Sequence, residues 1–251
     1  MLNVNRIARG QLQTEPFEWA TIDGLFAPKD ARALAETYPS DHFKTVSGHG
    51  GEKDYDYEAR ALIKLGERAI SDADDLSPAW LQLAQDLVSP AYRTAMSTLS
   101  GRDLASAPVE VNVFHYGPGH LLGPHPDLPD KVTTHVLYFN RTWDAADGGC
   151  LRILRSRDAA DPVAEILPVV GNSAVLVRAD HSWHAVSRVV DSSGKSRRSV
   201  TVTFYRPGST SSMWPPDDTT PLHHYDAPDL DAETARPATA WARLRRFVSR
   251  R

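Results

Sequence analysis

The chain is short of the features that define several large protein classes. Its single cysteine, Cys150, excludes an intrachain disulfide and any cysteine-rich zinc or iron–sulfur site. No apolar run approaches the roughly 18 to 20 residues that a membrane-spanning helix needs. The first residues, MLNVNRIARGQLQTEPFEW, lack the apolar core of a secretory signal. These absences predict a cytoplasmic protein.

The chain also lacks a large excess of either charge. Its formal net charge is -4 and its sequence pI is about 6.2, so we expect no nucleic-acid partner. A content of 41% hydrophobic and 24% charged residues is typical of a globular protein. With no clear linker before about residue 207, we predict a single domain over residues 1–206. A proline-rich segment and a basic tail would follow over 207–251.

The two halves of that domain differ in periodicity. Over residues 1–104 helices are expected to dominate, with Pro28, Pro78 and Pro90 each in the first turn of a helix. Over residues 105–206 short β-rich runs are separated by Gly, Pro, Asn and Asp: VEVNVFHY, VTTHVLYFN, CLRIL, AEILPVV, SAVLVRA, HAVSRVV and RRSVTVTFYRP. This pattern predicts a mainly β fold with flanking helices and a jelly-roll core of antiparallel strands.

Between these halves, residues 46–60 read VSGHGGEKDYDYEAR and show no clear periodicity. A mobile surface loop and a substrate lid are both open interpretations. The segment carries five charged residues that would suit a zwitterionic or polyhydroxylated ligand: Lys53, Asp54, Asp56, Glu58 and Arg60.

Two histidines and an aspartate form a candidate metal site. His125 and Asp127 stand two residues apart in GPHPDLPDK, a pattern that alone is more often a polar turn. In DHSWHAV, His181 and His184 would point to opposite faces of an extended chain, and His184 leads directly into a β run. Two imidazoles and one carboxylate leave three metal positions open, as oxygen-activating Fe(II) requires. We therefore predict His125, Asp127 and His184 as ligands.

A dicarboxylate cosubstrate beside such a metal would need a fixed cation. In RRSVTVTFY, Arg197 and Ser199 share one face of the strand, while Arg198 points the other way. On the run 132–140, Tyr138 alternates with apolar neighbours, so its hydroxyl would face the pocket, unless it is an ordinary core tyrosine.

The segment 109–206 resembles the prolyl-hydroxylase-like branch of the Fe(II)/2-oxoglutarate oxygenases. YGPGHLLGPHPD is similar to the family's Tyr-x-x-Gly, five residues and His-x-Asp. VLYFNRTWDAADGGCLRIL is similar to its strand followed by Trp and Gly-Gly, and WHAV and RRS to its distal histidine and Arg-x-Ser. The segment PFEWATIDGLFAPKDARALAETYP also looks like the amino-terminal part of such oxygenases.

The resemblance implies a double-stranded β-helix (jelly-roll, cupin-like) core with Fe(II) and 2-oxoglutarate as cofactor and cosubstrate. It makes His125, Asp127 and His184 the iron ligands. It makes Arg197 the salt-bridge partner of the far carboxylate of 2-oxoglutarate, with hydrogen bonds from Tyr138 and Ser199. Tyr116 would line the cosubstrate pocket, unless a bulge exchanges its face with that of His115.

The reaction implied consumes O2, converts 2-oxoglutarate to succinate and CO2, and hydroxylates a substrate C–H, with ascorbate as an expected stimulant. Asp127 favours hydroxylation, because related halogenases have a small residue in its place. We predict a small polar metabolite as substrate, an amino acid or biosynthetic intermediate held under the 46–60 segment. A peptidyl-prolyl substrate is the alternative, and a non-catalytic metal-binding sensor or interaction module is a second one.

The basic end of the chain is expected to be an accessory helix. Trp241, Leu244 and Val248 recur at helical spacing among arginines. Docking on its own domain or on a second subunit of a homo-oligomer is the favoured interpretation. Binding to an anionic membrane or acidic partner is the weaker one.

Overall fold

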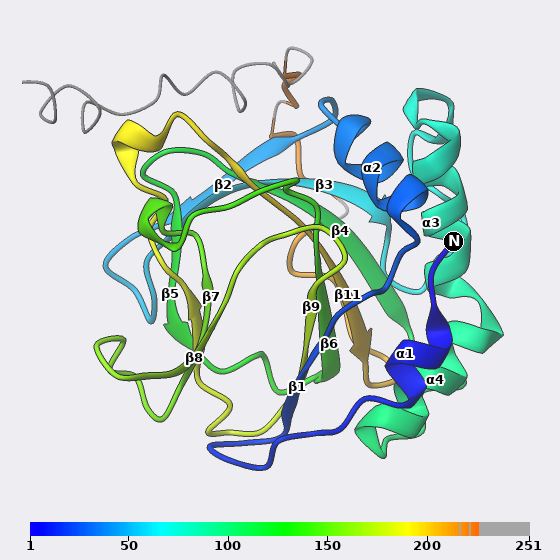
Figure 1. The fold of residues 1–251 in the computed structure, drawn as a ribbon, viewed down its shortest axis with the longest axis horizontal. Coiled ribbons are helices and arrows are strands. Elements are labelled where there is room, and N and C mark those ends of the chain that lie inside the picture. The colour runs from blue at the N-terminus through cyan, green and yellow to red at the C-terminus, as the bar shows by residue number, and fades with distance from the viewer. Residues whose placement is uncertain (216, 221, 226–251) are drawn as a thin grey trace, which may run out of the picture.

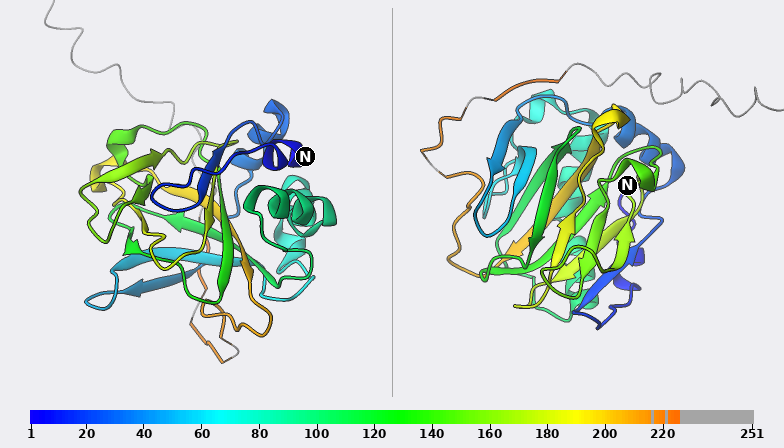
Figure 2. Two further views of the ribbon diagram at one scale, coloured as in Figure 1. Left: turned by 90° about the horizontal axis from the view of Figure 1, so that it is seen from below. Right: turned by 90° about the vertical axis from the view of Figure 1, so that its left-hand side faces the viewer.

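The computed structural model describes residues 1–215, 217–220 and 222–225. Its strands form one antiparallel sheet in the order β1-β9-β6-β11-β4-β3-β5-β10-β7-β8, with β2 paired to β3. The sheet curls into a nearly closed barrel (Figures 1 and 2). This is the jelly-roll architecture that the sequence predicts, and the prediction of a mainly β fold with flanking helices is confirmed.

The barrel has two layers, joined where β3 (Tyr55–Ile63) pairs with both β4 (Val109–Tyr116) and β5 (Leu121–His125). The larger layer adds β1 (Trp19–Ile22), β2 (Lys44–Gly48), β6 (Lys131–Tyr138), β9 (Ser173–Val177) and β11 (Arg197–Tyr205). The smaller layer adds β7 (Leu151–Leu154), β8 (Pro162–Ile166) and β10 (His184–Val186).

The alternation of side chains along the larger layer separates a core from a cavity. Val109, Val111 and Val113 of β4 pack in an apolar cluster with the helices, whereas the residues between them point into the barrel. Figure 1 shows the helices gathered on one side of the molecule. They are α1 (Val4–Ala8), α2 (Pro28–Glu36), α3 (Pro78–Val88) and α4 (Pro90–Ser100). The helices thus cover the outer face of the larger layer.

The prediction of helices from proline positions is confirmed. Pro28, Pro78 and Pro90 each stand at the start of a helix, where a missing backbone N–H costs nothing. The Ser77 and Ser89 hydroxyls accept hydrogen bonds from the backbone N–H of Trp80 and Tyr92, which caps α3 and α4.

The interpretation of residues 46–60 as a loop is wrong. Residues 44–48 and 55–63 are the strands β2 and β3, paired from Lys44–Ala59 to Gly48–Tyr55, so only residues 49–54 connect them. The second half of β3 is buried on both faces and therefore shows no alternation of polar and apolar residues. The first hundred residues accordingly contain three strands besides their helices.

Two smaller differences concern the β-rich half. The segment LLGPH was not predicted as a strand, yet it forms β5 and pairs with β10 and β3. In the run AEILPVV the strand β8 lies earlier, over Pro162–Ile166, and ends before Pro168, which has no N–H to donate to a neighbouring strand.

In the part of the chain that the structure describes, no helix is long and apolar enough to cross a membrane. The cytoplasmic location stays a prediction. The predicted basic helix around Trp241, Leu244 and Val248 lies outside the described residues.

Candidate metal centre and cavity

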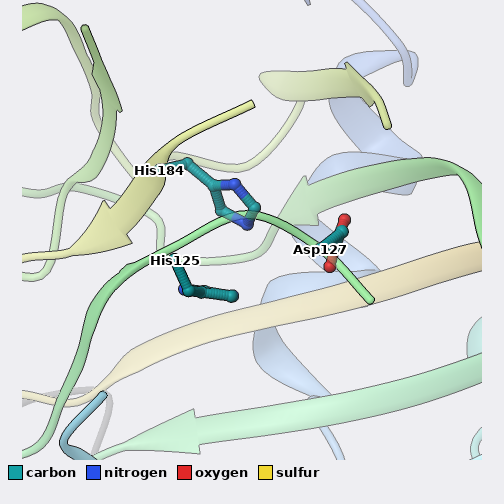
Figure 3. A group of neighbouring side chains, drawn as sticks. All are labelled: His125, Asp127 and His184. Carbon is teal, nitrogen blue, oxygen red and sulfur yellow. The ribbon is translucent and has the colours of Figure 1, made fainter. Parts of the chain in front are cut away.

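The three predicted ligands converge at the rim of the smaller layer. His125 ends β5, Asp127 follows two residues later, and His184 begins β10, directly opposite His125 in the strand pairing. Their ligand atoms lie within 4.8 Å of one another, and all three side chains are buried (Figure 3). His181 is exposed and lies outside this cluster.

Both histidines are oriented by a backbone carbonyl. Nδ1 of His125 lies 2.9 Å from the Gly123 oxygen, and Nδ1 of His184 lies 2.9 Å from the Ser182 oxygen. A carbonyl only accepts, so each Nδ1 carries the proton and each Nε2 keeps a lone pair for a metal. Burial lowers the pKa of both imidazoles, and each is therefore neutral at neutral pH.

Asp127 is held in its charged form. Thr134 donates a 2.9 Å hydrogen bond to Oδ2, and the Lys131 ammonium donates one of 2.6 Å to Oδ1. Burial acts to raise the pKa of Asp127, but the Lys131 ammonium holds it well below its ordinary value. Two neutral imidazoles and one carboxylate are the donor set that suits Fe(II) with open positions.

A second polar group lies at the start of β11. Arg197 is 2% exposed, and its Nη1 donates a 2.7 Å hydrogen bond to the Ser199 hydroxyl. Its guanidinium carbon lies 4.9 Å from the ring centre of Tyr116 and 5.3 Å from that of Tyr138. Among the described residues, Nε of Arg197 and the hydroxyl of Tyr138 have no hydrogen-bond partner. A buried cation with unused donors is suited to a carboxylate ligand.

The candidate metal site and Arg197 line one cavity of about 130 Å³ between the two layers. Tyr116 lines it, while His115 points the other way and lies 3.3 Å from Glu58, so no bulge exchanges their faces. Tyr138 is fully buried and lies behind Arg197 rather than in the lining. Burial raises the pKa of Tyr116 to about 12, so its hydroxyl stays protonated.

The charged residues of the 46–60 segment do not form a ligand site together. Only Lys53 lines the cavity. The others have partners elsewhere: Asp54 with the Gly50 N–H, Asp56 with His49, Glu58 with His115 and His223, and Arg60 with Asp41. The five charged residues therefore do not gather around the cavity, and a lid over a small polar ligand stays a prediction.

Several cavity residues were missed in the sequence. Glu110 and Asn112 share a strand face with Tyr116, so alternation along β4 could have identified them. Ser212 and Met213, in contrast, follow the last strand in a segment without periodicity and gave no signal.

Residues 111–206 match the family model described as the 2OG-Fe(II) oxygenase superfamily. The matched segment contains all seven predicted site residues, His125, Asp127, His184, Arg197, Ser199, Tyr138 and Tyr116. The match supports an oxygenase segment of that superfamily over residues 111–206. Its prolyl-hydroxylase-like branch, which the sequence resembles, also contains the relatives found by comparison.

One curated relative is a prolyl 3,4-dihydroxylase of Ostreococcus tauri, 31% identical over 149 residues. The match covers 55% of this chain and 29% of the relative, so the chain spans less than a third of that protein. A prolyl-4-hydroxylase of Pseudomonas putida has a similar fold, with a TM-score of 0.51 and 21% identity over 81% of this chain and 97% of the other.

The fold is also similar to that of a Trichoplax adhaerens prolyl hydroxylase solved with a peptide fragment of the hypoxia-inducible factor. That match has a TM-score of 0.50 and 17% identity, and it covers 80% of this chain and 88% of the other. The match to the oxygenase family agrees with the barrel and with a cavity lined by a metal donor set and a buried arginine.

Proposed function

We propose that this chain is an Fe(II)- and 2-oxoglutarate-dependent dioxygenase that hydroxylates prolyl residues of a peptide or protein. The observation that carries the proposal is the buried set of His125, Asp127 and His184, which lines one cavity with the unsatisfied Arg197 guanidinium. The family match supports the cofactor and the cosubstrate.

The donor groups support a metal position between the three side chains. Nε2 of His125, Nε2 of His184 and the Asp127 carboxylate would hold Fe(II), leaving three positions open. With 2-oxoglutarate and O2, the bound metal supplies the oxidising chemistry that hydroxylates a C–H and yields succinate and CO2. The Gly123 and Ser182 carbonyls keep the two imidazoles in the tautomer that can ligate.

Arg197 would bind the far carboxylate of 2-oxoglutarate. Its Nε is a donor without a partner, Ser199 orients the guanidinium through Nη1, and the Tyr138 ring packs against it. Tyr116 packs against the guanidinium and excludes water from the ion pair. Because the donors are buried, the contact would be stronger than on the surface.

The size of the cavity supports a substrate that enters only in part. At about 130 Å³ it is smaller than the roughly 300 to 1,000 Å³ of typical ligand pockets, so it has little room for a cosubstrate and a whole metabolite together. A peptide would place one prolyl ring at the metal and keep the rest outside. The name of the Ostreococcus relative also supports this alternative over the small metabolite predicted first.

Turnover of proline-containing peptides tests the proposal. Purified protein with Fe(II), 2-oxoglutarate, ascorbate and O2 is expected to form succinate and to add one oxygen atom to a prolyl residue, detected by mass spectrometry. Asp127→Ala should form neither product. Oxygen added to a free amino acid, with none added to any peptide, would contradict the prolyl assignment and restore the metabolite substrate.

A further inference from the structure

The cavity contains a second buried charge that the proposed chemistry does not use. Glu110 lies on β4 with its side chain in the cavity, and the residue is 3% exposed. Its carboxylate accepts hydrogen bonds from Ser211 (2.5 Å), Tyr205 (3.2 Å) and Asn112 (3.2 Å). All three donors are neutral. Among the described residues, Glu110 makes no ion pair with a lysine, arginine or histidine.

Strand pairing places Glu110 level with the metal site. Glu110 is opposite Thr203 of β11, and Thr203 is opposite Thr134 of β6, which donates to Asp127. Two strand spacings separate the Glu110 and Thr134 backbones, or roughly 10 Å. Arg197 precedes Thr203 by six residues on β11, or roughly 20 Å along the strand. Arg197, which would bind the cosubstrate, and Glu110 therefore lie in different parts of the cavity.

The two lysines of the cavity interact with Asp127 rather than with Glu110. Lys131 is bound to Asp127 at 2.6 Å. Lys53 is also close enough to Asp127 and Lys131 for both to affect its pKa, which burial lowers to about 8. A carboxylate offers about four acceptor positions, and the neutral partners of Glu110 use three. A cation that entered the cavity would find at Glu110 a buried charge still to be neutralised.

We propose that Glu110 selects substrates that carry an ammonium or guanidinium group next to the reacting carbon. The inference rests on the proposed function, and for a peptide it means a lysine or arginine beside the target proline. A free basic amino acid would present the same group, so the test includes both sources. A charge-assisted hydrogen bond in a buried site is expected to favour the cationic substrate at least tenfold.

Binding is measured first, without turnover. Anaerobic holoenzyme with Fe(II) and 2-oxoglutarate is titrated calorimetrically with a short peptide that has lysine on both sides of proline, and with its norleucine analogue of similar length. We expect the lysine peptide to bind at least tenfold more tightly. Equal affinities would overturn the inference, and this comparison uses the unaltered protein.

The variant Glu110→Gln keeps the size and an acceptor oxygen while removing the charge. We expect it to bind both peptides with equal affinity, because its affinity for the lysine peptide falls while that for the norleucine peptide is unchanged. Glu67→Gln changes net charge by the same amount at an exposed position outside the cavity, and it should keep the preference. A preference that persisted in Glu110→Gln would also overturn the inference.

Admitting oxygen separates the two proposals. A lysine preference that depends on Glu110, with no oxygen added to proline, would support the inference and contradict prolyl hydroxylation. Equal hydroxylation of both peptides would support prolyl hydroxylation and contradict the role of Glu110. L-lysine and L-arginine are compared with L-norleucine in the same titration. If Glu110 is needed for binding of these amino acids and no peptide binds, the cation belongs to a free metabolite. If no cationic probe binds, Glu110 has no such role.

Discussion

His125 and His184 face each other across the pairing of β5 and β10, with ring centres 4.4 Å apart. Each imidazole is bound through Nδ1 to the backbone carbonyl two residues earlier in the chain, so neither can turn without breaking that bond. The site is therefore preorganised by backbone rather than by other side chains.

We predict that His184→Ala abolishes stoichiometric Fe(II) binding, because it removes one of three protein donors. His181→Ala is the matched control, since that exposed side chain lies outside the cluster. Metal content after anaerobic loading and desalting measures both. Retention of iron by His184→Ala together with loss in His181→Ala would move the third ligand to His181.

Arg197→Ala should weaken 2-oxoglutarate binding by roughly 10- to 150-fold, the equivalent of about 1.5 to 3 kcal/mol for a hydrogen-bonded charged group. Arg198→Ala should have little effect, because that guanidinium lies over the Tyr38 ring on the opposite face of the sheet. Calorimetric titration of 2-oxoglutarate into the iron-loaded variants gives both constants. A larger loss in Arg198→Ala would contradict the assignment of faces on β11.

The motifs identified the side chains that converge on the metal and on Arg197, because spacing and strand alternation are local properties of the chain. They could not identify Lys131 and Thr134 as partners of Asp127. Those contacts depend on how the turn after β5 folds back onto β6. Glu110 was missed for another reason: it alternates with valines, and alternation alone does not tell a residue that faces a cavity from one that faces solvent.

At the scale of elements, the turn before β7 has almost no room for a side chain. Gly148 has φ +71°, and a Cβ there would lie 1.9 Å from the Arg188 carbonyl oxygen. Its own carbonyl accepts a 2.7 Å hydrogen bond from the Trp143 indole. This close approach explains why the sequence has Gly-Gly at this point, between the tryptophan and the strand.

Gly148→Ala should accordingly destabilise the fold by several kcal/mol, beyond the roughly 1 to 3 kcal/mol of backbone strain alone. Gly171→Ala provides the control, because φ is +92° there too but nothing lies within 4 Å of the added Cβ. Chemical denaturation gives both free energies of unfolding. Similar losses in the two variants would mean that the Arg188 carbonyl can move aside at little cost.

The elements that the sequence predicted best are those with local start signals or alternation, such as α3, α4 and β4. The hairpin of β2 and β3 was missed because its strands are stabilised by partners distant in sequence. β3 pairs with β4 and β5, 48 to 67 residues further along the chain. Such pairing overrides the weak local preferences of a segment rich in glycine and charge.

At the scale of the whole molecule, the burial of His135 makes the free energy of unfolding depend on pH. His135 is fully buried between the sheet and α4, with Nδ1 2.9 Å from the Tyr92 hydroxyl, and burial lowers its pKa to about 3. In the unfolded chain its pKa is about 6.5. Between these values the unfolded state binds the extra proton, so stability is lost as the pH falls.

We expect His135 to contribute a loss of up to about 1.4 kcal/mol per pH unit below pH 6.5. Urea unfolding of metal-free protein at several pH values between 7 and 4 measures the slope. In His135→Gln, the free energy of unfolding should change less steeply with pH, because one titrating group is gone. We expect this smaller slope even if the variant is less stable than the wild type at pH 7. An unchanged slope would show that other groups carry the acid sensitivity.

The sequence predicts that the domain ends at residue 206, but residues after it contact the barrel. Composition changes after residue 206, which predicted the boundary there, but residues 207–215, 217–220 and 222–225 make contacts with the barrel. The Trp214 indole donates a 2.7 Å hydrogen bond to Asn112, and His223 pairs with Phe43. Tyr225 stacks on His115 with ring centres 4.2 Å apart. Such contacts give no periodic signal, because they belong to a segment without regular structure.

Truncation after Arg206 should therefore lower the unfolding midpoint by about 5 to 10 °C, equivalent to roughly 2 to 4 kcal/mol in a domain of this size. It should also weaken 2-oxoglutarate binding, since it removes Ser212 and Met213 from the cavity lining and opens that side to water. Deletion of residues 236–251 is the comparison, because the sequence predicts an accessory role for them and unchanged iron and cosubstrate binding. Calorimetric melting and titration of both truncated proteins check these expectations. If the truncation after Arg206 behaved like the full chain, the oxygenase domain would end at β11; if the shorter deletion lost iron, it would extend to the end of the chain.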